Sequence, residues 1–311
     1  MDPSRNSALF AGCLAALGWG LTGTFVKLLP DFTTLEVLSL RLGVAFLVTL
    51  PIFLTNRLLR MQFFELIRTP LGLGLSSLMV FYYLFAVRAF QLAPVSDVVL
   101  VVGLSPLIGL AVKAAMRKPV ALWEGLGALM AFVGLILFVL PKLQGTFGQS
   151  TYLIGLFFAF LSACVTLGYA ALFKHYTRQR KTLNPISVAF TTFILGSIVV
   201  TPMAVFTTPQ WLLNFRQLNV VWIVLGLGTL STVVPTFCYS YAAKHLAPIL
   251  TTTLNLLTPI FAAMIAVLLL KEPFPILSLI GASLILLGIL LLSLSKSQGT
   301  EQRDVRRKAS E

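Results

Sequence analysis

Carboxyl, amide and hydroxyl groups are rare in the long apolar runs of this sequence, so each is a candidate for chemistry. Asp97 lies three residues after Pro94, and Ser105 lies eight residues further along, on the same helical face. A carboxyl group inside a run of membrane length usually faces a water-filled cavity or a partner. Burial disfavours its charged form, so Asp97 could take up and release a coupling proton. The alternative is a carboxylate at a helix N-terminus, stabilised by the helix dipole and by interfacial water.

A second polar face lies on a later run. Thr251, Asn255 and Thr258 are four and three residues apart, which places them on one side of a helix. Each of these two runs contains an inner proline, Pro106 or Pro259, which removes a backbone hydrogen bond and is expected to kink the helix. Interrupted helices at matching places in two halves of a chain indicate a transport site. The alternative is that the hydroxyl groups bond to the backbone or support helix packing.

Aromatic side chains within the apolar runs could stack on an organic substrate or hold a cation. The candidates are Trp19, Tyr82, Tyr83, Tyr239 and Tyr241. The alternative is an aromatic belt at the membrane interface, or simple packing. Trp19 lies near the middle of its run, so a belt explains it poorly.

Two basic residues lie in the first two runs. Arg41 and Lys27 could bind an anionic group. Alternatively, Lys27 extends its amine to the interface, and Arg41 pairs with a carboxylate or with backbone carbonyl groups.

Patterns for metal binding and catalysis are missing from the sequence. The three cysteines have no CxxC spacing and no neighbouring histidines, so we predict no metal site, no cofactor and no catalytic residues. No GxxxxGK[ST] motif is present, which argues against an ATP-driven mechanism within this chain. The alternative class is a polytopic membrane enzyme acting on a lipid-linked substrate. Such an enzyme would need clustered acids or histidines, and the only histidines are His175 and His245.

Composition predicts an integral membrane protein. Of 311 residues, 58% are hydrophobic and 11% are charged, whereas a soluble domain has about 25% charged residues. The apolar runs are continuous rather than alternating, which favours helices over a β-barrel. The net charge of +13 lies mainly between the runs and in the tail, so it indicates membrane orientation rather than binding to nucleic acid. This distribution predicts a multi-pass protein of the cell's inner or plasma membrane with both termini in the cytoplasm.

The hydropathy pattern predicts ten membrane-spanning helices. They cover residues 7–29, 35–56, 70–90, 94–115, 120–141, 151–174, 185–206, 220–243, 248–270 and 275–295. The basic tail, residues 296–311, is expected to be cytoplasmic and disordered.

The two halves of the chain share their proline and glycine positions. Aligning Pro94 with Pro248 also aligns Pro119 with Pro273, Gly127 with Gly281 and Gly134 with Gly288. This match indicates two copies of one unit. Because each copy has an odd number of helices, the second copy enters the membrane from the opposite face. The predicted fold class is therefore an all-α integral membrane protein with ten transmembrane helices arranged as two inverted five-helix repeats, an architecture of secondary transporters.

Several short motifs carry a family likeness. They are Gly18-Trp19-Gly20 with Lys27, Arg41, the joints ending at Pro94 and Pro248, the prolines Pro106 and Pro259, and Lys271-Glu272-Pro273 followed by Gly281 and Gly288. With these motifs the chain resembles the EamA-type transporters of the drug/metabolite transporter superfamily over residues 8–140 and 151–295. It departs from the pattern at Arg117-Lys118, where the usual acidic residue is missing.

The resemblance implies two EamA-like repeats, residues 7–141 and 151–295. It implies transport of a small organic metabolite, such as an amino acid or a related compound, and export is the expected direction. The expected mechanism is alternating access between the repeats, in contact with the lipid bilayer and without enzymatic activity. Neither the resemblance nor the residues select a substrate, a coupling ion or an oligomeric state.

Overall fold

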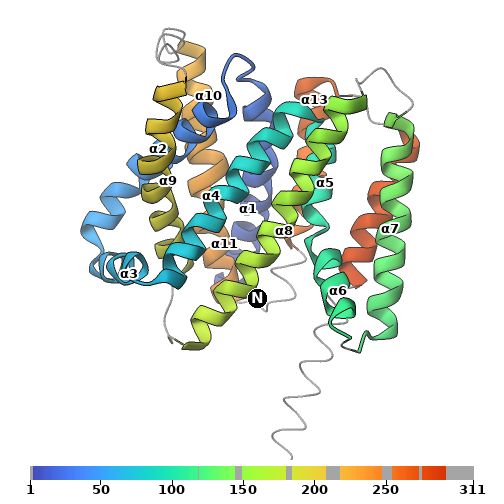
Figure 1. Ribbon diagram of the computed structural model, residues 1–311, viewed down its shortest axis with the longest axis horizontal. Helices are drawn as coiled ribbons and strands as arrows, with labels where there is room; N and C mark the ends of the chain where they lie inside the picture. The colour runs from blue at the N-terminus through green and yellow to red at the C-terminus, as the bar shows by residue number, and fades with distance from the viewer. Residues whose placement is uncertain are drawn as a thin grey trace, which may run out of the picture.

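The computed structural model describes residues 3–117, 119–143, 149–179, 184–207, 218–246, 254–272 and 275–291. Within these ranges all regular structure is helical, and the longer helices run roughly side by side (Figure 1). The expected helix 248–270 is described only from residue 254, and the tail 296–311 and Thr251 lie outside the described residues.

The helices follow one another along the chain with short connections. They are α1 (Pro3–Lys27), α2 (Thr34–Thr55), α3 (Arg57–Arg68), α4 (Pro70–Leu92), α5 (Val95–Gly103), α6 (Ser105–Ala115), α7 (Leu122–Leu143), α8 (Gln149–Gln179), α9 (Pro185–Thr207), α10 (Leu218–Gly228), the π-helix η2 (Thr229–Val233), α11 (Val234–His245), α13 (Leu257–Leu270) and a final helix, Ile276–Leu291. Eight helical stretches are long and apolar enough to cross a membrane, with α5–α6 and α10–η2–α11 each counted as one stretch. Two shorter apolar helices, Leu257–Leu270 and Ile276–Leu291, follow them.

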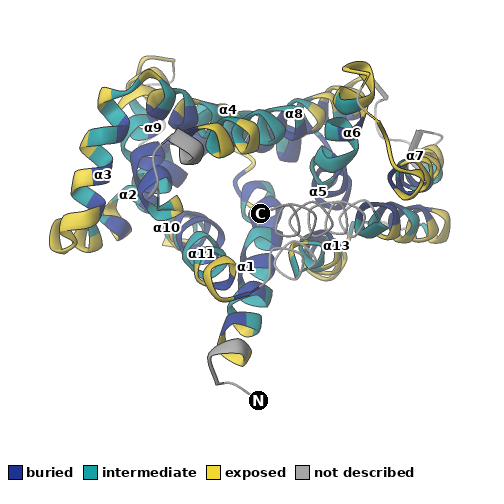
Figure 2. Cartoon of the chain, turned by 90° about the horizontal axis from the view of Figure 1, so that it is seen from below, coloured by how far each residue is buried: buried dark blue, intermediate teal, exposed yellow. Residues whose placement is uncertain are grey.

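Large apolar side chains cover much of the outer surface, as expected for helices that face lipid. Phe206, Leu122 and Leu268 are among the most exposed of them. Figure 2 shows exposed residues gathered on the outer sides of α3 and α7, whereas buried residues line the inner sides of the helices. In the described part of the chain, one core cluster brings together buried residues from α1, α4, α5 and α13.

The structure contains one helix where the sequence predicts only a connection between two spans. Residues 57–68 form α3, whose buried side chains are Leu59, Gln62 and Leu66. The side chain of Asn56 caps this helix by accepting the amide hydrogens of residues 58 and 59. With 12 residues α3 is too short to cross a bilayer, but its single apolar face is enough to hold it against α9. Hydropathy alone therefore missed it.

Both proline-containing runs are interrupted close to their inner prolines. The expected helix 94–115 is divided into α5 and α6 by a turn at Leu104, and Pro106 lies in the first turn of α6. In the second half, a turn at Leu256 precedes α13, in which Pro259 is the third residue. The two interruptions therefore occur at matching positions of the two halves.

The joints that follow these runs also share an unusual backbone conformation. Among the described residues other than glycine, only Arg117 and Lys271 have positive φ angles, and both angles are 54°. These are equivalent residues when Pro119 is aligned with Pro273. Such a left-handed residue is a common way to end a helix.

The helices α7 and Ile276–Leu291 cross at the aligned glycines (Figure 1). A Cβ atom added to Gly134 would lie 2.7 Å from the carbonyl oxygen of Gly281, and one added to Gly281 would lie 2.6 Å from that of Gly134. One added to Gly288 would lie 2.5 Å from the carbonyl oxygen of Gly127. When each glycine is replaced by its aligned equivalent in the other half, the Gly134–Gly281 pair becomes the Gly288–Gly127 pair. The crossing therefore has local two-fold symmetry.

Candidate functional site

Asp97 lies in the first turn of α5 and is completely buried. The hydroxyl group of Tyr152 in α8 donates a hydrogen bond to its Oδ2 atom at 2.8 Å, and the hydroxyl group of Ser96 donates to Oδ1 at 2.9 Å. Hydroxyl groups thus take the place of water around this carboxyl group. The position also fits the alternative reading, because a carboxylate in the first turn interacts favourably with the helix dipole.

The N-terminus of α5 is capped from the other half of the chain. Pro94 has no polar side chain, and the Val95 amide instead donates to both carboxylate oxygens of Glu272 at 3.0 Å each. Burial raises the pKa of the Glu272 carboxyl group above its ordinary value, while the Val95 amide and the positive charge of Lys27 act in the opposite direction. Asp97 adds to the upward shift.

Lys27, Asp97, Tyr152 and Glu272 therefore form one charged cluster, where α1 ends and α5 begins. From the sequence, Asp97 is a candidate coupling group, Lys27 is expected to bind an anion or to extend its amine to the interface, and Glu272 is noted only as part of a motif. No local pattern could join them, because they lie on separate elements. The Lys271-Glu272-Pro273 motif was the available signal for Glu272.

Arg41 is another buried charged residue. Its side chain is 2% exposed and lies in the apolar helix α2. Its Nε atom donates to the Thr232 hydroxyl oxygen at 2.8 Å, and its Nη2 atom lies 3.4 Å from the carbonyl oxygen of Ser231. The guanidinium carbon lies 4.4 Å from the centre of the Tyr83 ring. No carboxylate of a described residue forms an ion pair with Arg41.

The π-helix η2 positions these acceptors. The Thr232 hydroxyl donates to the carbonyl oxygen of Leu227 at 2.8 Å, five residues earlier, so its lone pairs are directed at Arg41. π-bulges in helices are frequent at functional sites. The sequence predicts one regular helix over residues 220–243, because a π-helix has no signature in hydropathy.

Four of the five predicted aromatic residues form two ring pairs. Trp19 of α1 lies 5.2 Å from Tyr239 of α11, and Tyr82 lies 5.3 Å from Tyr83 on α4. Both α4 and α11 pack against α1. Tyr241 is instead 41% exposed, and its ring contacts His245 at 4.4 Å.

The remaining polar candidates are not drawn into these contacts. Ser105 is half-buried at the start of α6. Thr258 donates a hydrogen bond of 3.2 Å to the side-chain oxygen of Asn255, which is exposed. Pro259 is buried in α13. We also predict that Asn255 and Trp19 border one central cavity, although no described contact joins these two residues.

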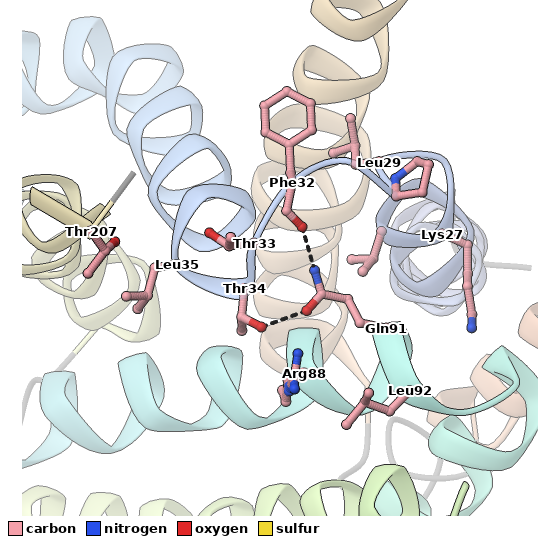
Figure 3. Close-up of a pocket in the computed structure, with 12 residues that line it drawn as sticks. Lys27, Leu29, Phe32, Thr33, Thr34, Leu35, Arg88, Gln91, Leu92 and Thr207 are labelled. Atoms are coloured by element: carbon pink, nitrogen blue, oxygen red, sulfur yellow. Dashed lines mark hydrogen bonds between the residues drawn. The ribbon is translucent and has the colours of Figure 1, made fainter. Parts of the chain in front are cut away.

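A cavity of about 700 Å³ opens beside the connection between α1 and α2. Figure 3 shows Gln91 of α4 at its centre, where it donates to the carbonyl oxygen of Phe32 at 3.0 Å and accepts from the hydroxyl of Thr34 at 2.6 Å. Lys27 and Arg88 give the lining two positive side chains. The cavity thus reaches the charged cluster through Lys27.

Comparison with known proteins extends these observations to the whole chain. The model of the EamA-like transporter family matches residues 6–140 and again residues 153–294. Two proteins of Archaeoglobus fulgidus, each described as an uncharacterized transporter, are similar along nearly their full length. One is 28% identical over 279 residues, covering 89% of this chain and 93% of the relative, and the other is 23% identical over 278 residues, covering 88% and 94%.

A solved structure titled "Crystal structure of protein" has the same fold. It superposes with a TM-score of 0.58 at 17% identity, covering 94% of this chain and 99% of that chain. The family match and the named relatives indicate transport rather than catalysis, in a lipid membrane and with a small-molecule substrate. With two matched segments that span most of its length and many apolar helices, the chain is a multi-pass membrane protein of the EamA-like transporter family.

Proposed function

We propose that the protein is a secondary carrier that moves a small organic metabolite by alternating access between two inverted five-helix repeats, residues 7–141 and 151–295. The proposal rests on one observation: buried polar contacts connect the two halves of the chain. Asp97 meets Tyr152, Arg41 meets Thr232, and the Val95 amide meets Glu272, so each contact crosses from one half of the chain to the other. Hydrogen bonds at such an interface can break and form again as the two halves move.

The inverted arrangement is supported by the local symmetry of the fold. The matching backbone conformations of Arg117 and Lys271, and the reciprocal glycine contacts between α7 and Ile276–Leu291, are both expected of two related halves. Ten spans would then consist of the eight long stretches together with the two shorter apolar helices. An odd number of helices per repeat gives the halves opposite orientations.

The substrate would bind between the repeats, with aromatic residues of α1, α4 and α11 around it. Trp19, Tyr82, Tyr83 and Tyr239 offer ring faces there, and Ser105 and Thr258 belong to the helices beside the two interruptions. Thr251, Asn255 and Tyr241 stay candidates for contact with the substrate. Amino acids and related compounds are the proposed substrates and export is the proposed direction, with both termini in the cytoplasm of a cell whose inner or plasma membrane holds the protein.

Asp97 is the proposed coupling group for protons. Its carboxyl group is enclosed by two hydroxyl donors in the present conformation. Opening of the charged cluster would expose this carboxyl group to water, and closure would return it to its contacts with Tyr152 and Ser96. The transport cycle would then alternate between these two environments.

Flux into reconstituted vesicles tests the proposed function. Vesicles with purified protein, and no nucleotide, are compared with empty vesicles across a panel of labelled amino acids and small organic acids. At least one compound should cross faster with the protein present. Trp19→Ala should lower this flux without preventing membrane insertion, whereas Trp123→Ala, at an exposed position of α7, should not. A folded protein that moves none of the compounds contradicts the proposal.

A further inference from the structure

We propose that Arg41 binds the carboxylate of the transported molecule, which makes the substrate an organic acid with an apolar or aromatic body. This inference rests on the proposed function and names the substrate class of the same site. It begins from a charge that the described protein leaves without a counter-charge.

A buried arginine is costly to place in a membrane. Arg41 lies seven residues into the apolar helix α2, about 10 Å along its axis, and is 2% exposed. An arginine at the centre of a membrane-spanning helix costs about 2.5–3.5 kcal/mol on insertion scales. Such a residue persists where a partner or a function compensates for it.

The partners of Arg41 in the structure are all uncharged. A guanidinium group has five N–H donors, and the contacts to Thr232 and Ser231 use one at Nε and one at Nη2. The Tyr83 ring adds a cation–π contact. These contacts fix the position of the guanidinium plane but leave its positive charge to be balanced by something else.

The other cations near the core differ from Arg41 in this respect. Lys113 forms an ion pair of 2.6 Å with Glu124, and Lys27 lies in the field of Glu272 in the charged cluster. Their charges are balanced within the protein. Arg41 differs from these two lysines, because its described contacts are with Thr232, Ser231 and Tyr83 and include no carboxylate.

A carboxylate fits this position best. The remaining Nη donors lie in one plane, and a carboxylate can accept two parallel hydrogen bonds from such an edge. Tyr82, next to Tyr83, and the Trp19–Tyr239 pair are only half-buried and offer apolar ring faces. Tyr83, which contacts the guanidinium group, and its neighbour Tyr82 thus provide aromatic surface beside Arg41 for the rest of the molecule.

The alternative is that Arg41 only ties α2 to η2. A structural role would require the hydrogen bonds of Arg41 to η2. It would not make the protein bind an acid more tightly than the corresponding amide. A test must therefore compare ligands that differ only in the carboxylate, as well as variants of the protein.

Ligand-induced thermal stabilisation of the purified protein in detergent provides this comparison, since binding to the folded state raises the unfolding midpoint. The probes are phenylalanine, leucine and 3-phenylpropionate, each paired with its amide. We expect at least one acid to stabilise the wild type while its amide does not. In Arg41→Gln the affinity for that acid should fall about tenfold or more, as expected for loss of hydrogen bonds between charged groups. Arg68→Gln, at an exposed position of α3, should respond like the wild type.

Several results would overturn the inference. These are equal stabilisation by acid and amide, stabilisation by none of the acids, or an unchanged response in Arg41→Gln. If Arg41→Gln does not fold, the wild-type comparison of acid with amide decides, and Arg41→Lys, which keeps the charge but not the planar fork, should bind more weakly. Vesicle flux of uncharged or cationic compounds alone would sink this inference but leave the proposed function standing. Binding of an acid without any flux would support this inference but contradict the proposed function.

Discussion

The Glu272 carboxylate caps helix α5 by accepting the Val95 amide hydrogen with both of its oxygen atoms, each 3.0 Å away. These residues are 177 positions apart in the sequence and belong to different halves of the chain. The contact joins the end of α13 to the start of the helix that carries Asp97. It therefore links the two halves where the charged cluster lies.

Removal of this cap should destabilise the protein. Glu272→Ala leaves the Val95 amide without its acceptor, and loss of a helix cap costs about 1 kcal/mol. Glu272→Gln keeps one acceptor oxygen and should lose less. Unfolding midpoints of both variants in detergent give the order, and a Glu272→Ala midpoint equal to that of the wild type would mean that the cap contributes nothing.

The same residue should make stability depend on pH. Burial raises the pKa of Glu272 in the folded protein, in the presence of Lys27 and Asp97, so the folded state holds this proton more tightly than the unfolded state does. The tighter proton binding contributes fully to the stability of the folded protein below the ordinary glutamate pKa of about 4.3. This contribution is lost as the pH rises through the raised pKa of Glu272 in the folded protein. Wild type should therefore lose stability relative to Glu272→Gln over that window. A constant difference, or one of opposite sign, contradicts this.

The glycine crossing should not tolerate side chains. Gly288→Ala would place a methyl group 2.5 Å from the Gly127 carbonyl oxygen and force α7 and Ile276–Leu291 apart. Overpacking of this kind costs about 1–3 kcal/mol. Gly125→Ala is the matched control, because a Cβ atom there has no neighbour within 4 Å. Equal unfolding midpoints for the two variants would show that the close crossing does not matter for stability.

These glycines show how far the sequence alone reaches. The aligned positions Gly127, Gly134, Gly281 and Gly288 could be predicted to share a role, because repeated spacing survives in the sequence. Their partners in the crossing could not be predicted, because each glycine contacts a glycine of the other half that is not its aligned counterpart: Gly134 contacts Gly281, and Gly127 contacts Gly288. The contact pairs appear only when the two helices are placed in space.

The candidate site was predictable to a similar extent. Asp97 could be found because a carboxyl group in an apolar run is rare. Its partner Tyr152 could not, because a tyrosine in an apolar run has no distinguishing pattern. Arg41 could be recognised as a cation within an apolar run, but its neighbours on η2 depend on an extra residue in one helical turn, which hydropathy does not record.

Asp97→Asn should separate proton coupling from transport. The amide keeps the shape of the side chain but cannot exchange a proton, so accumulation driven by a pH gradient should be lost while downhill exchange continues. Tyr152→Phe removes the 2.8 Å hydrogen bond and should change the pH dependence of accumulation rather than abolish it. Flux into vesicles with an imposed pH gradient measures both. Wild-type accumulation by Asp97→Asn would exclude Asp97 as the coupling group.

The termini should both lie in the cytoplasm. Arg57, Arg60 and Arg68 precede α4 on the same side as the basic tail if the predicted spans are correct, and cytoplasmic segments are enriched in such residues. Reporter domains fused to the C-terminus should be active only if they function inside the cell. A reporter active outside would overturn the proposed orientation.

Alternating access itself is tested most directly by counterflow. Vesicles are loaded with a high concentration of an unlabelled compound that the flux panel identifies, and uptake of its labelled form from outside is followed. A carrier whose binding site alternates between two sides should show labelled uptake that is several times faster than in vesicles loaded with buffer, with a transient overshoot. Uptake that is independent of the internal compound would indicate a channel-like path and contradict the proposed cycle.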